Sequence, residues 1–225
     1  NHEVMKLSRT GHTSWTLAEV AFTDGPYLAV NTTATTLTPA SAGVATGVNI
    51  TASAITGING GVGWLATDVG RIISFNSGKA KITARTNTTV VVCTITTAFT
   101  NTDATAAFKL GAFSDTTGHP SCVSFFEQRL VFAGTTDEPQ TLYFSKSGDY
   151  ENMTTGTSAD DAMVYTIASN QVNKIRYLKS VRTLLIGTTG GEFSVSADGT
   201  DAAVTPTNVT IKRQSSFGAA NVDAQ

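Results

Sequence analysis

The stretch RLVFAGTTDEPQTLYFSKSGD, residues 129–149, decides the expected fold because its pattern returns as RTLLIGTTGGEFSVSADG, residues 182–199. In each copy two apolar runs flank a polar turn, which predicts a β-hairpin. The first strand of the two copies aligns at an offset of 53 residues, with Arg129 on Arg182. The second strand aligns at an offset of 49, with Phe144 on Phe193. The chain therefore contains an internal repeat of one hairpin.

The two copies differ in length only within the turn, where DEPQTLY is replaced by GGE. Because turns tolerate insertions, we expect the strand register to be the same in both copies. A hairpin that recurs with a period near 50 residues is typical of β-propeller blades. Residues 113–225 have room for about two blades, whereas a closed propeller needs at least about four. We therefore expect partial β-propeller-like blades, or a stacked β sandwich as the alternative.

Composition favours an all-β chain without an electrostatic grip on nucleic acid. Threonine, valine, isoleucine and phenylalanine, which suit β-strands, are abundant. Charged residues make up 14% of the chain and the formal net charge is −2, so tight binding to phosphates is not expected. No apolar run approaches the roughly 20 residues that cross a bilayer, and the first residues, NHEVMKLSRTGH, lack the apolar core of a signal peptide. We expect a soluble chain that is an internal piece of a longer protein.

A change of texture divides the expected domains. Residues 31–58 are rich in Thr, Ala, Ser and Gly, and could be light strands or a disordered linker. They lead into three strand candidates, DVGRIISF, KAKITAR and TVVVCTITTAF, which are separated by turn signals. We therefore expect a small antiparallel β-sandwich or barrel at 31–110, inserted into a propeller-like body formed by 1–30 and 111–225.

Few residues are suited to chemistry. Cys93 and Cys122 lie in apolar runs, where buried free thiols are the default. The histidines do not have metal-ligand spacing and are expected at the surface or in turns: His2, His12 and His119. Asp160 and Asp161 are the best carboxylate pair, but neighbours on a strand point to opposite faces, so a solvated loop is expected instead. We expect no enzyme activity, cofactor or metal.

Residues 113–153, FSDTTGHPSCVSFFEQRLVFAGTTDEPQTLYFSKSGDYENM, resemble the tail tubular protein B, or nozzle, family of short-tailed bacteriophages. The resemblance extends over about 140 residues and leaves out the 31–110 module. A Phe stands at 193, where many relatives are expected to have Trp. The matching residues occur in order along the chain: Trp15-Thr16-Leu17, Gly25-Pro26, Ser114-Asp115, Gly118-His119-Pro120, Phe125, Gln128-Arg129-Leu130, Gly134-Thr135, Pro139-Gln140-Thr141, Ser147-Gly148-Asp149-Tyr150, Ala168-Ser169, Gln171-Val172-Asn173, Ile175, Leu178, Leu184-Leu185, Gly190-Gly191-Glu192-Phe193, Gln214-Ser215 and Gly218.

This resemblance implies a structural protein of the virion. Six copies would form a nozzle at the phage tail, below the portal and adaptor rings and near the tail fibres, and the genome would leave through its channel without specific binding. The family has no catalytic residues to transfer to this chain.

Two alternatives compete with a purely structural role. The first is a carbohydrate-binding or host-surface module at 31–110, with Trp64 as an exposed aromatic platform for a ligand, although a lone tryptophan is more often part of a core. The second is a polysaccharide-degrading tail enzyme, for which no pair of facing carboxylates is apparent.

Overall fold

The computed structural model describes residues 2–168, 172–199 and 202–220. Strands make up 44% of it and helices 3%, and the strands of every sheet pair antiparallel, so the predicted all-β class is confirmed. The chain divides into two compact units. One consists of Asn1–Pro26 with Gly118–Gln225, and the other, which we call the module, is Tyr27–Thr117. No helix in the described ranges is long and apolar enough to cross a membrane.

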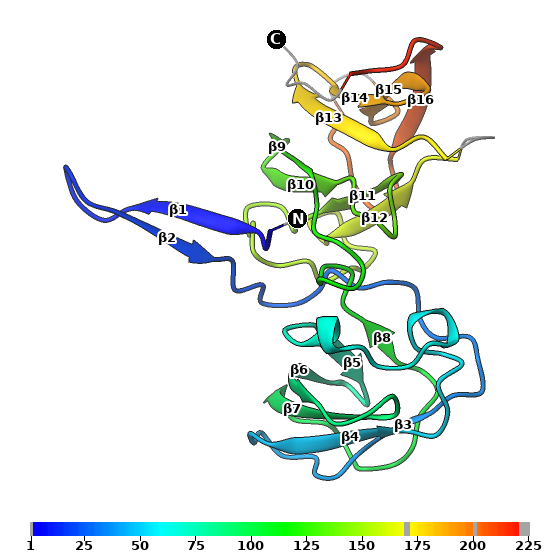
Figure 1. Ribbon diagram of the computed structural model, residues 1–225. Coiled ribbons are helices and arrows are strands. Elements are labelled where there is room, and N and C mark those ends of the chain that lie inside the picture. Colours follow the sequence, from blue (N-terminus) through cyan, green and yellow to red (C-terminus); the bar gives the residue numbers. More distant parts are fainter. Residues whose placement is uncertain (1, 169–171, 200–201, 221–225) are drawn as a thin grey trace. The chain divides into compact units, whose positions relative to one another are not determined.

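The module is built on a six-stranded sheet that curls into a half-barrel (Figure 1). The strand order is β3-β4-β7-β6-β5-β8. Its elements are β3 (Leu37–Pro39), β4 (Val48–Ala52), the short 3-10 turns η1 (Asn59–Gly61) and η2 (Ala66–Asp68), β5 (Ile72–Phe75), β6 (Gly78–Arg85), β7 (Val90–Thr97) and β8 (Lys109–Leu110). The three predicted strands are β5, β6 and β7, and the Thr-rich opening supplies β3 and β4. The disordered-linker alternative for that opening is therefore wrong.

Alternating side chains explain why these segments form strands around one core. β4 buries Val48, Ile50 and Ala52 and exposes the residues between them, as the two-residue period of a strand requires. Between β5 and β6, Asn76 and Ser77 both have positive φ, which is typical of the two-residue turn that matches strand twist. The buried cluster inside the curl includes Leu37, Ile50, Trp64, Ile82, Cys93 and Phe108.

The other unit contains two four-stranded antiparallel meanders, which we call the first and second blades (Figure 1). The first blade consists of β9 (Cys122–Phe126), β10 (Arg129–Ala133), β11 (Thr141–Phe144) and β12 (Met163–Thr166). The second consists of β13 (Ile175–Ser180), β14 (Leu184–Thr188), β15 (Gly191–Ser196) and β16 (Thr210–Ser215). One buried cluster draws on both blades, including Val131, Phe144, Ile186 and Val195. The blade-like fold expected from the repeat is thus present.

The repeated hairpin occupies the middle two strands of each blade, but its register differs by two residues. Val131 pairs with Phe144 in the first blade, whereas the aligned Leu184 pairs with Val195, and Phe193 pairs with Ile186. The expectation of an unchanged register is therefore wrong, because the shorter second turn moves the pairing. Since side chains alternate with period two, a shift of two leaves Phe193 facing the core as Phe144 does.

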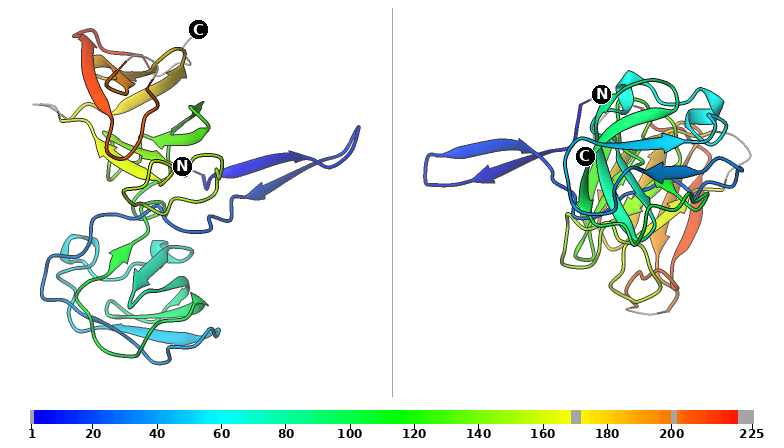
Figure 2. Two further views of the ribbon diagram at one scale, coloured as in Figure 1. Left: turned by 180° about the vertical axis from the view of Figure 1, so that it is seen from behind. Right: turned by 90° about the horizontal axis from the view of Figure 1, so that it is seen from below.

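A separate hairpin, which we call the arm, projects from the blades of its unit (Figures 1 and 2). It consists of β1 (Met5–Arg9) and β2 (Trp15–Glu19), and almost all of its side chains are exposed. Backbone bonds from Thr10 and Gly11 to the Ser14 carbonyl close its tip, at 2.9 and 3.2 Å. At its base, Lys6 forms an ion pair with Glu151.

Both cysteines are free and buried, as the sequence predicted. Burial raises the pKa of Cys93 from its ordinary 9.0 to about 12, because an apolar core solvates a thiolate poorly. We expect neither thiol to react with an aromatic disulfide reagent at pH 8 until the chain is unfolded. A Val44→Cys variant is the positive control, since Val44 is exposed. Native thiols that react as fast as the one introduced at position 44 would contradict this burial.

Candidate functional site

Trp64, the candidate ligand platform, is fully buried in the module core. Its burial agrees with the usual core position of a lone tryptophan, so the exposed-platform alternative is wrong, and the ring has no open face on which a sugar could stack. Its backbone N–H donates to the Thr88 carbonyl at 2.9 Å, and its own carbonyl accepts from Arg85 Nε at 2.7 Å. Both contacts attach the tryptophan to neighbouring loops and strands. The residue is therefore part of the packing.

The indole N–H of Trp64 is buried without a hydrogen-bond partner among the described residues. A buried unsatisfied donor is costly, so Trp64→Phe removes that cost together with some packing. We expect this variant to lower the free energy of unfolding by less than about 1.5 kcal/mol, because the core keeps an aromatic ring. Urea unfolding followed by circular dichroism measures it. A loss well above that value would show that the indole N–H is satisfied by a group such as a buried water.

Asp160 and Asp161 lie in a turn, and both reach the same lysine. Their carboxylates lie 3.5 and 3.1 Å from Lys146 Nζ. The prediction of a loop is confirmed, but the reasoning that the two residues point apart does not hold, because they are not on a strand. The hydrogen bond from Lys146 lowers the pKa of Asp161, whereas a glycosidase acid needs a raised pKa. This pair is suited to an ion pair rather than to proton donation.

The histidines are dispersed among different environments. His2 is exposed, and His12 lies at the arm tip, where Arg9 Nη2 is 2.9 Å from its Nδ1. His119 is buried, so the expectation that it lies at the surface or in a turn is wrong. Within the described residues, no group of three or more His, Cys, Asp and Glu side chains is placed to hold a metal ion.

A buried polar cluster in the module was missed by sequence reasoning. Arg71 and Asp68 are both fully buried and form an ion pair with Nη1 and Oδ1 3.0 Å apart. Asn59 donates to Asp68 Oδ2 at 2.7 Å and accepts from Arg71 Nη1 at 2.7 Å. Arg71 Nε donates to the Gly111 carbonyl at 2.8 Å, and the Leu65 amide donates to Asp68 at 2.8 Å. The cluster joins three loops and is structural in character.

Arg129, one of the motif residues, has a similar role in the first blade. Its buried guanidinium donates to the carbonyls of Ser145, Ala159 and Asp161, at 2.8, 2.5 and 2.7 Å. Gly134 and Gly148, also in the motifs, adopt positive φ at turns, which glycine does without strain. Ser169 and Gln171, two further motif residues, lie outside the described residues. The motif residues named here therefore hold turns and strand ends.

Two groups of exposed apolar side chains occur in this unit, besides further exposed residues such as Val172, Val181 and Phe217, which are 75, 57 and 79% exposed. The first is on the arm, where Met5, Leu7, Trp15 and Leu17 are 45, 64, 58 and 65% exposed. The second, which we call the β9 patch, consists of Val123, Phe125 and Tyr150, at 59, 61 and 40%. Phe125 and Tyr150 meet edge to face with ring centroids 5.1 Å apart. Exposed apolar side chains gathered in this way mark interaction surfaces.

The outer face of the second blade is polar, in contrast to that of the first. Tyr177 and Ser215 both donate to the Glu192 carboxylate, at 3.3 and 2.8 Å, and Gln214 donates to Ser194 at 2.7 Å. Lys179 and Lys212 lie on the same face, as the strand pairing shows. In the first blade, by contrast, the apolar side chains of Val123, Phe125 and Val164 are exposed.

Comparison with known protein families finds no family model that matches the chain, and comparison with curated proteins finds no significant match.

Proposed function

We propose that the chain is a structural component of a bacteriophage tail, part of a ring around the channel through which the genome leaves. The observation that carries the proposal is the repeated blade: two four-stranded meanders that share one core. This architecture agrees with the propeller-like body that the motif resemblance implies. The clamp formed by Arg129 supports the same reading, because a motif residue serves the frame of the blade.

The charge of the chain is compatible with a channel wall. The chain has fifteen Lys and Arg residues and seventeen Asp and Glu residues, so as a whole it has no excess of positive charge that would retain a passing DNA duplex. In this proposal the genome is a transient neighbour, and the lasting partners are further copies of the chain, the portal and adaptor rings, and the tail fibres. The role is architectural and not enzymatic.

The alternatives lack comparable support. The carbohydrate-binding reading of the module relied on Trp64, which is buried. The glycosidase reading relied on Asp160 and Asp161, which share one lysine. In this proposal the module is an inserted β domain that contacts a neighbouring protein or the host surface through residues other than Trp64.

Immunoelectron microscopy of the phage particles tests the proposal. Antibodies raised against residues 118–168 are expected to label the tail axis next to the head. Antibodies against the major capsid protein are the matched control, and should label the head alone. Labelling of the capsid or of the host cell, without label on the tail, would contradict the proposed location.

A further inference from the structure

The arm has one apolar and one polar face. Because Leu7 pairs with Leu17 and Arg9 with Trp15, these side chains share a face with Met5 and Glu19. Lys6, Ser8, Thr16 and Ala18 form the other face. Such alternation is the pattern of a strand pair with one buried side, yet the apolar side is exposed. The composition of the arm is therefore that of a protein interface, but its apolar face is exposed in the single chain.

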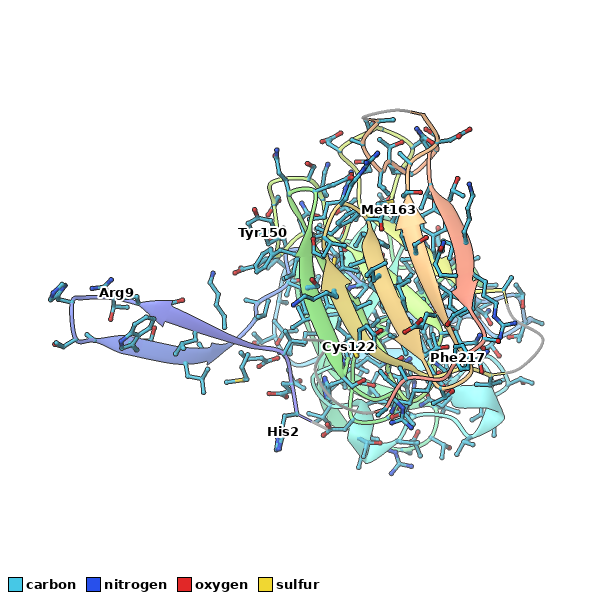
Figure 3. All side chains as sticks on the ribbon, turned by 90° about the horizontal axis from the view of Figure 1, so that it is seen from above. His2, Arg9, Cys122, Tyr150, Met163 and Phe217 are labelled. Atoms are coloured by element: carbon cyan, nitrogen blue, oxygen red, sulfur yellow. The ribbon has the colours of Figure 1, made fainter. Side chains whose placement is uncertain are left out.

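Two strands alone give an arm little stability of its own, since an isolated hairpin is marginal in water. The arm compensates locally: Arg9 lies over the Trp15 ring, 5.9 Å from its centroid, and donates to the Gly11 carbonyl at 3.0 Å. The Lys6–Glu151 ion pair attaches its base to the first blade. Figure 3 shows the arm extending away from the sheets, with Arg9 near its far end. These contacts act within the arm and at its base.

We propose that the arm packs its apolar face on the β9 patch of a second copy of this chain. Both surfaces belong to the same unit, and both are uncovered in one chain, because the arm points away from the sheets. If each copy donates an arm and receives one, every arm and every patch is covered. Such a head-to-tail contact is heterologous and generates a ring where the rotation closes.

Charge supports a second copy as the occupant. The arm contains Lys6, Arg9 and His12 against one carboxylate, Glu19, while Tyr150 of the patch is flanked by Asp149 and by Glu151, which already pairs with Lys6 of its own chain. On a larger scale, residues 118–168 have seven carboxylates and two cations, whereas residues 172–220 have six cations and three carboxylates. Opposite charge of this kind favours the contact of unlike ends of two copies and opposes the contact of like ends.

The size of the arm shows that it acts together with a wider contact. Five residues per strand give it a footprint of roughly 17 Å by 10 Å. This is well below the roughly 800 Å² that each partner buries in a standard interface. The oppositely charged blades can supply the remainder, and the arm fixes the direction of the contact.

Paired substitutions on the two faces of the arm test the proposal in the 225-residue chain. Leu7→Asp with Leu17→Asp alters the apolar face, and Ser8→Asp with Thr16→Asp places the same charges on the opposite face, one residue away. Sedimentation velocity over a concentration series is expected to show self-association weakened at least about tenfold by the first pair and by less than about threefold by the second. A monomeric parent chain, or equal effects of the two pairs, would overturn the proposal.

Disulfide trapping identifies the receiving surface. A chain with Leu17→Cys is mixed with a mass-tagged chain with Phe125→Cys. The native cysteines are not expected to form disulfides, because both are buried. A disulfide between the two different chains is the expected product, and Val172→Cys replaces Phe125→Cys as the exposed control. Trapping only between two arms, or equal trapping with the control, would overturn the β9 patch as the receiver. Arm-dependent binding to phosphatidylglycerol vesicles without any trapping would assign the arm to a lipid surface instead.

This inference names a contact between neighbouring copies in the proposed ring. It rests on the proposed tail function only for the number of copies in that ring. Loss of trapping in an intact ring would remove the arm contact and leave the ring standing. Trapping in an assembly unrelated to a phage tail would leave the arm contact standing and remove the proposed function in the tail.

Discussion

Replacing Asp68 by alanine is expected to destabilise the module by about 3–5 kcal/mol, because it leaves the buried Arg71 charge without its carboxylate. The substitution also leaves the Leu65 amide and the Asn59 side chain without the oxygen to which both donate. Removal of one partner from a buried pair is costly because the remaining charge cannot return to water. Asp103→Ala is the matched control, since Asp103 is an exposed carboxylate of the same unit, and should change stability by less than about 0.5 kcal/mol.

Tryptophan fluorescence can report this loss for the module alone. The chain has two tryptophans, of which Trp64 is buried in the module and Trp15 is exposed on the arm. In a Trp15→Phe background, urea unfolding followed by fluorescence therefore monitors the environment of Trp64. Adding Arg71→Ala to Asp68→Ala should cost less than the sum of the single changes, since the two residues act as a unit. A loss from Asp68→Ala as small as that from Asp103→Ala would show that the pair is solvated.

Replacing Arg129 by alanine is expected to destabilise the first blade by about 3 kcal/mol, because three carbonyls lose a charged donor. Arg129→Lys should recover only part of this loss, since an ammonium cannot span the carbonyls of Ser145, Ala159 and Asp161 as a planar guanidinium does. Hydrogen exchange of residues 141–161 measures the effect locally. We expect the amides of β11 and of the 158–161 turn to exchange faster in both variants.

The repeat provides the control for Arg129. Arg182 is its aligned counterpart in the second copy, but its side chain is exposed. Arg182→Ala should therefore change stability by less than about 0.5 kcal/mol and leave hydrogen exchange in the first blade unchanged. Equal losses from the two variants would mean that the Arg129 clamp contributes no more than a surface arginine.

The sequence predicted the frame of the fold because hydrophobic alternation and turn residues act locally. The strands β5, β6 and β7, the free cysteines and the repeated hairpin were all readable from neighbouring residues. The two-residue shift in register was not, because it depends on how the shorter turn closes between Thr188 and Gly191. A local pattern of alternating residues predicts which face of a strand is buried. It predicts less well which residue of the neighbouring strand pairs with a given residue.

Burial of polar and aromatic side chains was harder to predict. Asp68 and Arg71 stand at the start of the strand candidate DVGRIISF, but β5 begins only at Ile72, and the two charged residues lie buried before it. Trp64 follows the same glycines, and its burial in the module core rules out the platform alternative. The arm was missed because its first strand is short, although the alternation of Met5 and Leu7 is visible in the sequence.

The most direct test of the proposed role is the symmetry of the assembled protein in the phage particle. Cryo-electron microscopy of the tail, at a resolution that separates β-sheets, should show six copies around the axis, with the two blades of each fitted into one subunit. The account predicts that an arm-shaped density extends from each subunit to its neighbour. A single copy, or a position away from the tail axis, would contradict the account.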